Sequence, residues 1–275
     1  MIGPPQTIRL TLAYEGTRYC GWQVQPGLPT VQGALAEAIR SVSGETILPQ
    51  GSSRTDSGVH ALGQLVVFTT ASSLTPAIWV RALNATLPSD ITVVEGCAVS
   101  NDFDAVTAPI SKRYRYRIHD APWRPVLQRS LVWRRKSRLD VPAMQVAANE
   151  LLGEHDFSSF ESASSARLSK VRTILSADIF RHSGYDDAAG AEVWIEVVGT
   201  GFLYNMVRII TGSLVMVGCG RQRPEWIREV IAARSRPAAG PTAPPQGLVL
   251  VSIELGPQTA AAFVERPAFD LSPDS

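Results

Sequence analysis

The sequence predicts an α+β protein made of two similar mixed α/β domains. Its 275 residues are enough for two domains of ordinary size. Segments that alternate with period two, as strands do, are interspersed with segments of helical periodicity in both halves of the chain. A hydrophobic content of 45% is typical of a folded protein and excludes a largely disordered one.

Residues 1–107 are predicted to form the first domain, with the element order β-α-β-β-α-β. In its first helix the apolar residues recur at three- and four-residue intervals, and Thr30 stands where an N-cap is expected. Its second helix carries Pro76 in the first turn. Strands are predicted at residues 7–14, 47–50, 63–70 and 91–94, and helices at residues 31–42 and 76–87.

Residues 108–255 are predicted to form the second domain, of the same mixed character. In its first strand, alternation puts Tyr114 and Tyr116 on one face and the arginines between them on the other. Residues 161–170 and 235–246 are interpreted as loops, and residues 256–275 as a loose tail. Strands are predicted at residues 112–119, 171–180, 192–198 and 248–255, and helices at residues 141–152, 202–217 and 225–233.

One long apolar segment could be either a membrane-spanning helix or a buried helix. Residues 197–220 contain a single charge, Arg208, but also five glycines, which favours a buried helix over a membrane span. The first ten residues lack the basic and apolar regions of a signal peptide. Three widely separated cysteines favour neither a disulfide framework nor a structural zinc site. We therefore expect a reducing, cytoplasmic location.

The net charge of +1 is unevenly distributed. Residues 1–107 hold 5 basic and 8 acidic side chains, whereas residues 108–255 hold 20 and 14. Ten of the basic residues lie between residues 112 and 138, with Asp120 as the only acidic residue there. This clustering favours a polyanion site in the second half, and the alternative is a merely solvated charged surface.

An isolated carboxylate, Asp56, lies in a polar turn at residues 51–64 between two predicted strands. Three interpretations are open. The first is an aspartate presented to a cleft, and the second is an ordinary Asx-turn formed by Asp-Ser-Gly. An aspartic protease is the third, but it needs two Asp-Ser/Thr-Gly copies and this chain has one.

The segment RTDSGVHA at residues 54–61, followed by Gly63-Gln64, closely resembles the signature of the TruA family of tRNA pseudouridine synthases. Further family motifs follow in order over residues 7–255: residues 14–16, 21–23, 30–32, 84–88, 103–105, 112–116, 153–160, 202–212 and 247–250. The resemblance implies an isomerase that converts uridine to pseudouridine at positions 38–40 of the tRNA anticodon arm. It also implies a homodimer, with an active-site cleft between the two domains of each chain.

The same resemblance implies roles for five residues. Asp56 is the catalytic nucleophile, and Arg208 is its partner. Tyr114 stacks on the target base, Leu248 lines the uracil pocket, and Arg54 helps to extrude the base or holds a phosphate. Spacing alone leaves simpler alternatives open, namely a sheet-face tyrosine, a strand leucine and a salt bridge in the turn.

Arg208 has an independent argument, because a lone guanidinium on an apolar helix needs a carboxylate partner unless it reaches the surface. His60, inside the motif, is interpreted as structural, because the isomerisation needs no group with a pKa near 7. The basic residues at 112–117 and 124–138 are interpreted as binding tRNA phosphates.

Two departures from the family pattern stand out. Asp104 and Val106 replace the usual His and Arg, so contacts to RNA are expected to differ. Ser52-Ser53 replaces the commoner Ala-Gly, with little effect expected.

No phosphate-binding or dinucleotide motif and no metal-ligand spacing occurs, so no cofactor and no metal are expected. The alternative function is a non-catalytic RNA-binding protein on the same scaffold, and the joint presence of Asp56, Tyr114 and Arg208 favours the enzyme.

Overall fold

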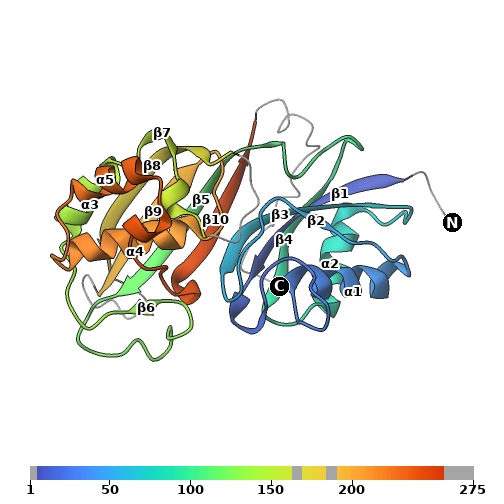
Figure 1. The fold of residues 1–275 in the computed structure, drawn as a ribbon. Helices are drawn as coiled ribbons and strands as arrows, with labels where there is room; N and C mark the ends of the chain where they lie inside the picture. Colours follow the sequence, from blue (N-terminus) through green and yellow to red (C-terminus); the bar gives the residue numbers. More distant parts are fainter. Residues whose placement is uncertain (1–4, 163–168, 184–190, 257–275) are drawn as a thin grey trace, which may run out of the picture.

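The computed structural model describes residues 5–162, 169–183 and 191–256 (Figure 1). It is an α+β fold built on one mixed sheet with the strand order β4-β1-β3-β10-β5-β9-β8-β7, to which β2 and β6 add at β3 and β5. Most of the predicted loop at 161–170 and all but the first residue of the predicted tail lie outside the described residues.

The first half has the predicted order of elements: β1 (Gln6–Tyr14), α1 (Val31–Ser43), β2 (Gln50–Gly51), β3 (His60–Thr70), α2 (Pro76–Thr86) and β4 (Ile91–Val99). Thr30 caps α1 as predicted, since its side chain accepts a hydrogen bond from the Gly33 N–H. The predicted strand at 47–50 shrinks to the two residues of β2. Strand β3 begins three residues earlier than predicted, inside the sequence motif.

The second half contains β5 (Pro109–His119), β6 (Trp133–Arg134), α3 (Val141–Asn149), β7 (Gly153–Asp156), β8 (Val171–His182), β9 (Glu192–Gly199), α4 (Met206–Gly218), α5 (Trp226–Ala233) and β10 (Leu248–Leu255). The short strands β6 and β7 were not predicted. Helix α4 begins four residues later than predicted, because Asn205 has a left-handed φ of 61° that cannot continue a helix.

The last strand joins the two halves. Strand β10 pairs antiparallel with β5 along its length. It pairs parallel with β3 only at Val249 and Leu250, which lie opposite His60 and Ala61. The sheet is therefore continuous through both halves, but the link between them is narrow.

One face of this sheet carries the main core. Tyr114 lies opposite Val197 and Leu250, and Tyr116 lies opposite Ile195, so that all five side chains are buried on the same face. Helices α1 and α2 lie by the strands of the first half, and α3, α4 and α5 by those of the second (Figure 1). The predicted alternation of β5 is confirmed, because its arginines point to the opposite face.

Helix α4 is almost entirely buried, in agreement with the predicted buried helix. None of the helices in the described ranges is long and apolar enough to cross a membrane.

Candidate active site

Asp56 lies in a tight turn between β2 and β3. The Val59 N–H donates to the Asp56 carbonyl at 3.1 Å, and Gly58 has a φ of 77°, which a β-turn of this kind requires at its third position. The neighbouring loop holds the turn in place, because the Trp22 N–H donates to the Thr55 carbonyl at 3.0 Å. The backbone around Asp56 is thus built from glycine and turn chemistry.

The side chain of Asp56 does not form an Asx-turn. Such a turn would use the Gly58 N–H, which donates instead to the Tyr19 carbonyl at 3.2 Å. Within the described part of the chain, the carboxylate has one hydrogen-bonding partner, Arg208. The carboxylate is therefore directed away from its own backbone and toward α4.

Arg208 lies in the first turn of α4, and its Nη1 is 3.4 Å from Asp56 Oδ2. The side chains are only 15% and 18% exposed, so both are largely shielded from solvent. Its Nε donates to the Ala243 carbonyl at 2.8 Å, and its Nη1 also donates to Asn205 Oδ1 at 2.6 Å. The ion pair expected from the sequence is thus present, across 152 residues of chain.

Burial raises the pKa of Asp56 above its ordinary value, and the charge and hydrogen bond of Arg208 partly offset that rise. A carboxylate that has lost most of its water next to one cation is suited to attack an electrophilic carbon or to stabilise a developing positive charge.

Tyr114 belongs to the same site. Its hydroxyl is 2.8 Å from Ser53 Oγ, three residues before Asp56, and its ring meets the ring of Phe202 edge-on at 5.0 Å. Burial raises the pKa of Tyr114 to about 12, with a smaller contribution from the nearby Asp56 charge, so the phenol stays protonated at neutral pH. Ser53 therefore contacts a candidate site residue.

Tyr116 is directed elsewhere, although alternation puts it on the same face as Tyr114. Its hydroxyl donates to the Pro244 carbonyl at 2.6 Å. Leu248 is buried at the start of β10, opposite Tyr116 in the sheet. Both residues therefore help to join β10 and the segment before it to β5.

Two polar residues support the turn, and no role for them was predicted from the sequence. Gln64 is fully buried, and its amide donates to the Ser53 carbonyl at 2.5 Å while accepting from the Ser53 N–H at 3.2 Å. The Tyr14 hydroxyl is 2.8 Å from Thr55 Oγ1. The sequence does contain a signal for these roles. A polar group in an otherwise apolar strand is expected to be buried, and a buried polar group needs a hydrogen-bonding partner.

Arg54 and His60 flank the turn and differ in exposure and in hydrogen bonding. Arg54 is exposed and has no ion pair with any described residue, so the turn salt bridge is not formed. His60 Nδ1 accepts from the Gly16 N–H at 3.0 Å, and its Nε2 lies 3.2 Å from the Gln246 carbonyl. Burial lowers the pKa of His60, so a neutral ring with both nitrogens engaged fits the predicted structural role.

Asp104 caps its own loop. Its carboxylate accepts from the Val106 N–H at 2.8 Å and from Thr107 Oγ1 at 3.0 Å. Ala105 packs with Leu65 and Val67 on the sheet face opposite the main core. At this departure from the family pattern, an uncharged side chain, Val106, is exposed.

The arginine row of β5 is partly neutralised on the face away from Asp56. Arg113 and Arg115 pair with Glu196 at 3.0 and 2.5 Å, and Arg117 pairs with Glu192 at 2.8 Å. Two glutamates therefore offset most of the charge that the sequence places on this strand. The row is not part of the Asp56 site.

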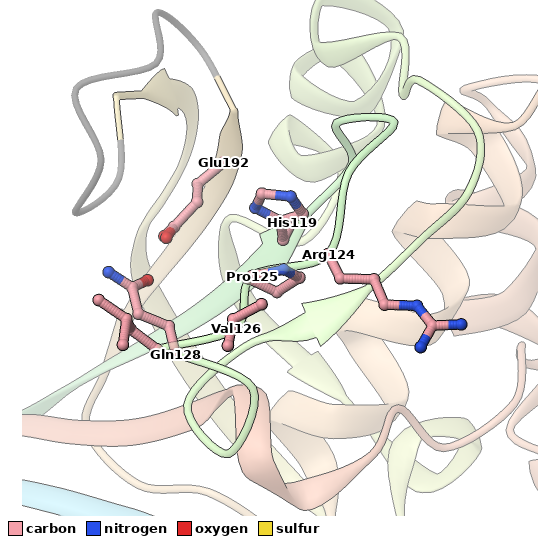
Figure 2. A pocket seen from close by; sticks show the side chains of 7 residues that line it. His119, Arg124, Pro125, Val126, Gln128 and Glu192 are labelled. Carbon is pink, nitrogen blue, oxygen red and sulfur yellow. The ribbon is translucent and has the colours of Figure 1, made fainter.

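Two cavities lie apart from Asp56. One, of about 120 Å³, is lined by residues 124–128 with His119 and Glu192, and Arg124 extends away from it (Figure 2). The other, of about 520 Å³, is lined in part by Arg115, Arg117 and Trp194. Neither includes the Asp56 carboxylate. No group of three or more His, Cys, Asp or Glu in the described ranges is placed to hold a metal ion.

A family model described as tRNA pseudouridine synthase matches residues 11–106 and 147–254 of the chain. A relative from Myxococcus xanthus, tRNA pseudouridine synthase A, is 43% identical over 246 residues, covering 90% of this chain and 91% of the relative. A second, of the same name, from Halalkalibacterium halodurans is 44% identical, covering 88% of this chain and 90% of the relative.

Among solved structures, a chain in "Structure of H/ACA RNP bound to a substrate RNA containing 2'-deoxyuridine" aligns with 76% of this chain and 44% of its own length, at 15% identity and a TM-score of 0.34. The family model and the relatives span both halves of the sheet and include the Asp56 turn and α4. The chain therefore belongs to the tRNA pseudouridine synthase family, whose members are isomerases.

Proposed function

We propose that this enzyme converts uridine to pseudouridine at positions 38–40 of the tRNA anticodon arm, with Asp56 as the nucleophile. The observation that carries the proposal is the partly buried Asp56–Arg208 ion pair, whose carboxylate makes no hydrogen bond to its own turn. Membership in the tRNA pseudouridine synthase family supports the reaction class.

The reaction breaks the C1′–N1 bond of uridine, rotates the uracil and joins C1′ to C5. Asp56 attacks C1′ as uracil leaves with the bonding electrons, or stabilises the sugar cation that forms. C5 then bonds to C1′ as the carboxylate leaves with the electrons of any ester bond that it had formed, after which the C5 proton is lost and N1 gains a proton. Atoms and charge therefore balance without an oxidant or reductant.

The other site residues bind and orient the substrate. Arg208 keeps Asp56 ionised in a partly desolvated site. Tyr114 packs against the uracil ring, and Leu248 forms an apolar side of its pocket. The target nucleotide has to leave its stack to reach Asp56, so base flipping is part of the proposal. Arg54, exposed two residues before Asp56, contacts a phosphate or fills the place of the extruded base.

The proposal also includes tRNA binding by the second half, a homodimer and a cytoplasmic location. Arg124 and Lys136 support tRNA binding, since neither forms an ion pair with a described residue. Exposed apolar side chains on the sheet face opposite the main core support an interface with a second copy, namely Leu62, Leu175 and Phe180.

The test is Asp56→Asn, assayed by tritium release from tRNA labelled at uracil C5 beside a tRNA-binding titration. Asparagine keeps the shape of the side chain but is not an anionic nucleophile, so we expect loss of essentially all turnover. Binding rests mainly on phosphate contacts and should change by less than about threefold. Asp102→Asn, at an exposed loop aspartate bonded to Ser100, is the matched control and should keep full activity.

Turnover within tenfold of the unsubstituted protein would refute Asp56 as the nucleophile. Loss of both turnover and binding would show that the turn serves RNA binding, which also contradicts the proposal. Tight tRNA binding by the unsubstituted chain without any tritium release would favour the non-catalytic RNA-binding alternative.

A further inference from the structure

Asn205 occupies an unusual backbone conformation directly before α4. Its φ of 61° and ψ of 8° lie in the left-handed region, which among non-glycine residues asparagine adopts most readily. Of the described non-glycine residues, only Arg234 also has a positive φ. A residue at this position normally caps the helix with its side chain, but the Asn205 side chain makes no capping hydrogen bond.

The amide of Asn205 is used instead to connect two other side chains. Its Oδ1 accepts from Arg208 Nη1 at 2.6 Å, and its Nδ2 donates to Ser162 Oγ at 2.9 Å. The bond to Arg208 sets the orientation of the amide, because a guanidinium only donates and therefore needs the amide oxygen, which leaves the NH₂ group facing the Ser162 hydroxyl.

The same Arg208 nitrogen serves both Asn205 and Asp56. An Nη group carries two hydrogens, so Nη1 can donate one to Asn205 at 2.6 Å and direct the other to Asp56 at 3.4 Å. The Nε of Arg208 is held separately by the Ala243 carbonyl at 2.8 Å. Two anchors therefore define the plane of the guanidinium, and Asn205 is the anchor next to the carboxylate.

We propose that Asn205 is a positioning residue that aims Arg208 at Asp56, and that its left-handed backbone is retained because it brings the amide oxygen to Nη1. The inference rests on the proposed role of Asp56. Without the amide, the guanidinium keeps only its Ala243 anchor and can turn about it. The longer of its two Nη1 contacts, the one to Asp56, is then the first to be lost.

The test is Asn205→Gly, because glycine accepts the positive φ and removes only the side chain. We expect kcat for pseudouridine formation to fall about 10- to 100-fold, as a small misplacement in a site does, with tRNA affinity unchanged within about twofold. The acid limb of the kcat–pH profile should move to higher pH, because Asp56 loses part of the influence that lowers its pKa. A purely structural role for Asn205 would not move that limb.

A double-substitution cycle shows whether Asn205 acts through Arg208. In an Arg208→Lys background, which lacks the planar guanidinium, Asn205→Gly should change kcat by less than about twofold. Arg234→Gly is the matched control. It likewise puts glycine at a left-handed position, and it removes a side chain that pairs with Asp156 at 3.5 Å. That control should leave kcat and the pH profile unchanged.

Three results would overturn the proposal. The first is a kcat and an acid limb in Asn205→Gly like those of the unsubstituted enzyme. The second is a fall in kcat on Asn205→Gly that is as large in the Arg208→Lys background as in the unsubstituted enzyme, and the third is the same fall and shift in Arg234→Gly. If any of these occurs while Asp56→Asn is inactive, the positioning role fails and the proposed function stands. If Asp56→Asn is active, the proposed function itself is refuted.

Discussion

Two opposing influences act on the Asp56 carboxyl. Burial disfavours its charged form and raises its pKa, whereas Arg208 favours the charged form and lowers it. The net result is a pKa above the ordinary value. The proposed mechanism needs the ionised form, which is present above this pKa and is lost as pH falls through it. Activity should therefore show an acid limb that reports on Asp56.

We predict that Arg208→Met moves this acid limb to higher pH and lowers the plateau of kcat by more than about tenfold. The substitution removes the group that lowers the Asp56 pKa, and the pKa then rises further. Methionine is compatible with an apolar helix, so the folded structure should persist. The measurement is kcat against pH, with circular dichroism as the check on folding. A limb at the same pH as in the unsubstituted enzyme would exclude Arg208 as the partner that sets the Asp56 charge.

Neighbouring serines in the turn offer a matched pair of variants. The Ser53 hydroxyl bonds the Tyr114 hydroxyl at 2.8 Å, whereas the buried Ser52 Oγ has no hydrogen-bond partner among the described residues. We predict that Ser53→Ala lowers kcat about two- to tenfold, because Tyr114 loses the contact that orients its phenol. Ser52→Ala should leave kcat unchanged and should not reduce the melting temperature. Equal effects of the two substitutions on kcat would contradict a specific role for Ser53.

Helix α4 holds Arg208 in place through close backbone packing. A Cβ added to Gly212 would lie 1.7 Å from the Pro241 carbonyl oxygen, so the helix touches residues 240–243 directly. That segment also supplies the Ala243 carbonyl that binds Arg208 Nε. The glycine on the buried side of α4 is therefore linked, through the segment it touches, to the geometry of the site.

We predict that Gly212→Ala destabilises the protein by about 2 kcal/mol or more, even though alanine favours helices by about 1 kcal/mol. The contact is with backbone and cannot be relieved by a rotamer change, so overpacking outweighs propensity. Activity should fall as well, because residues 241–243 must move. Gly201→Ala is the control, since its nearest contacts would be at 3.6 Å, and it should be tolerated. A higher melting temperature for Gly212→Ala would show that the helix can shift at no cost.

Across the whole molecule, the two faces of the sheet differ in role. The face with the helices carries Asp56, Tyr114 and Arg208. On the other face, Glu192 and Glu196 offset the arginine row of β5. The excess of basic residues in the second half therefore overstates the charge that is free to bind phosphates. Arg54, Arg124 and Lys136 are basic residues without an ion pair to any described residue.

We predict strongly salt-dependent tRNA binding. With roughly six phosphate contacts and a slope near −0.9 for each, the affinity should fall about 10³-fold between 50 and 200 mM salt. Lys136→Gln should lower the slope by about one, whereas Arg117→Gln, at a residue already paired with Glu192, should lower it less. Fluorescence titration over a salt series measures both. A flat response would mean that the basic residues are only a solvated surface.

Much of the local structure follows from the sequence alone. Period-two and helical patterns predict nearly all the long elements, and Thr30 predicts the start of α1. The single charge on α4 predicts a buried partner for Arg208, and the resemblance of the motifs names Asp56. These features are readable because burial imposes a regular spacing on residues that are close in the chain.

Other features were decided only by the tertiary structure. Alternation cannot distinguish Tyr114 from Tyr116 and only the resemblance names Tyr114, whereas the structure shows that the Tyr114 hydroxyl meets Ser53 and the Tyr116 hydroxyl meets Pro244. Pairing of the β5 arginines depends on glutamates 75 to 83 residues away, on a strand whose register places them opposite. Contacts between distant segments depend on strand order, register and close backbone approach, and no local spacing in one sequence encodes these.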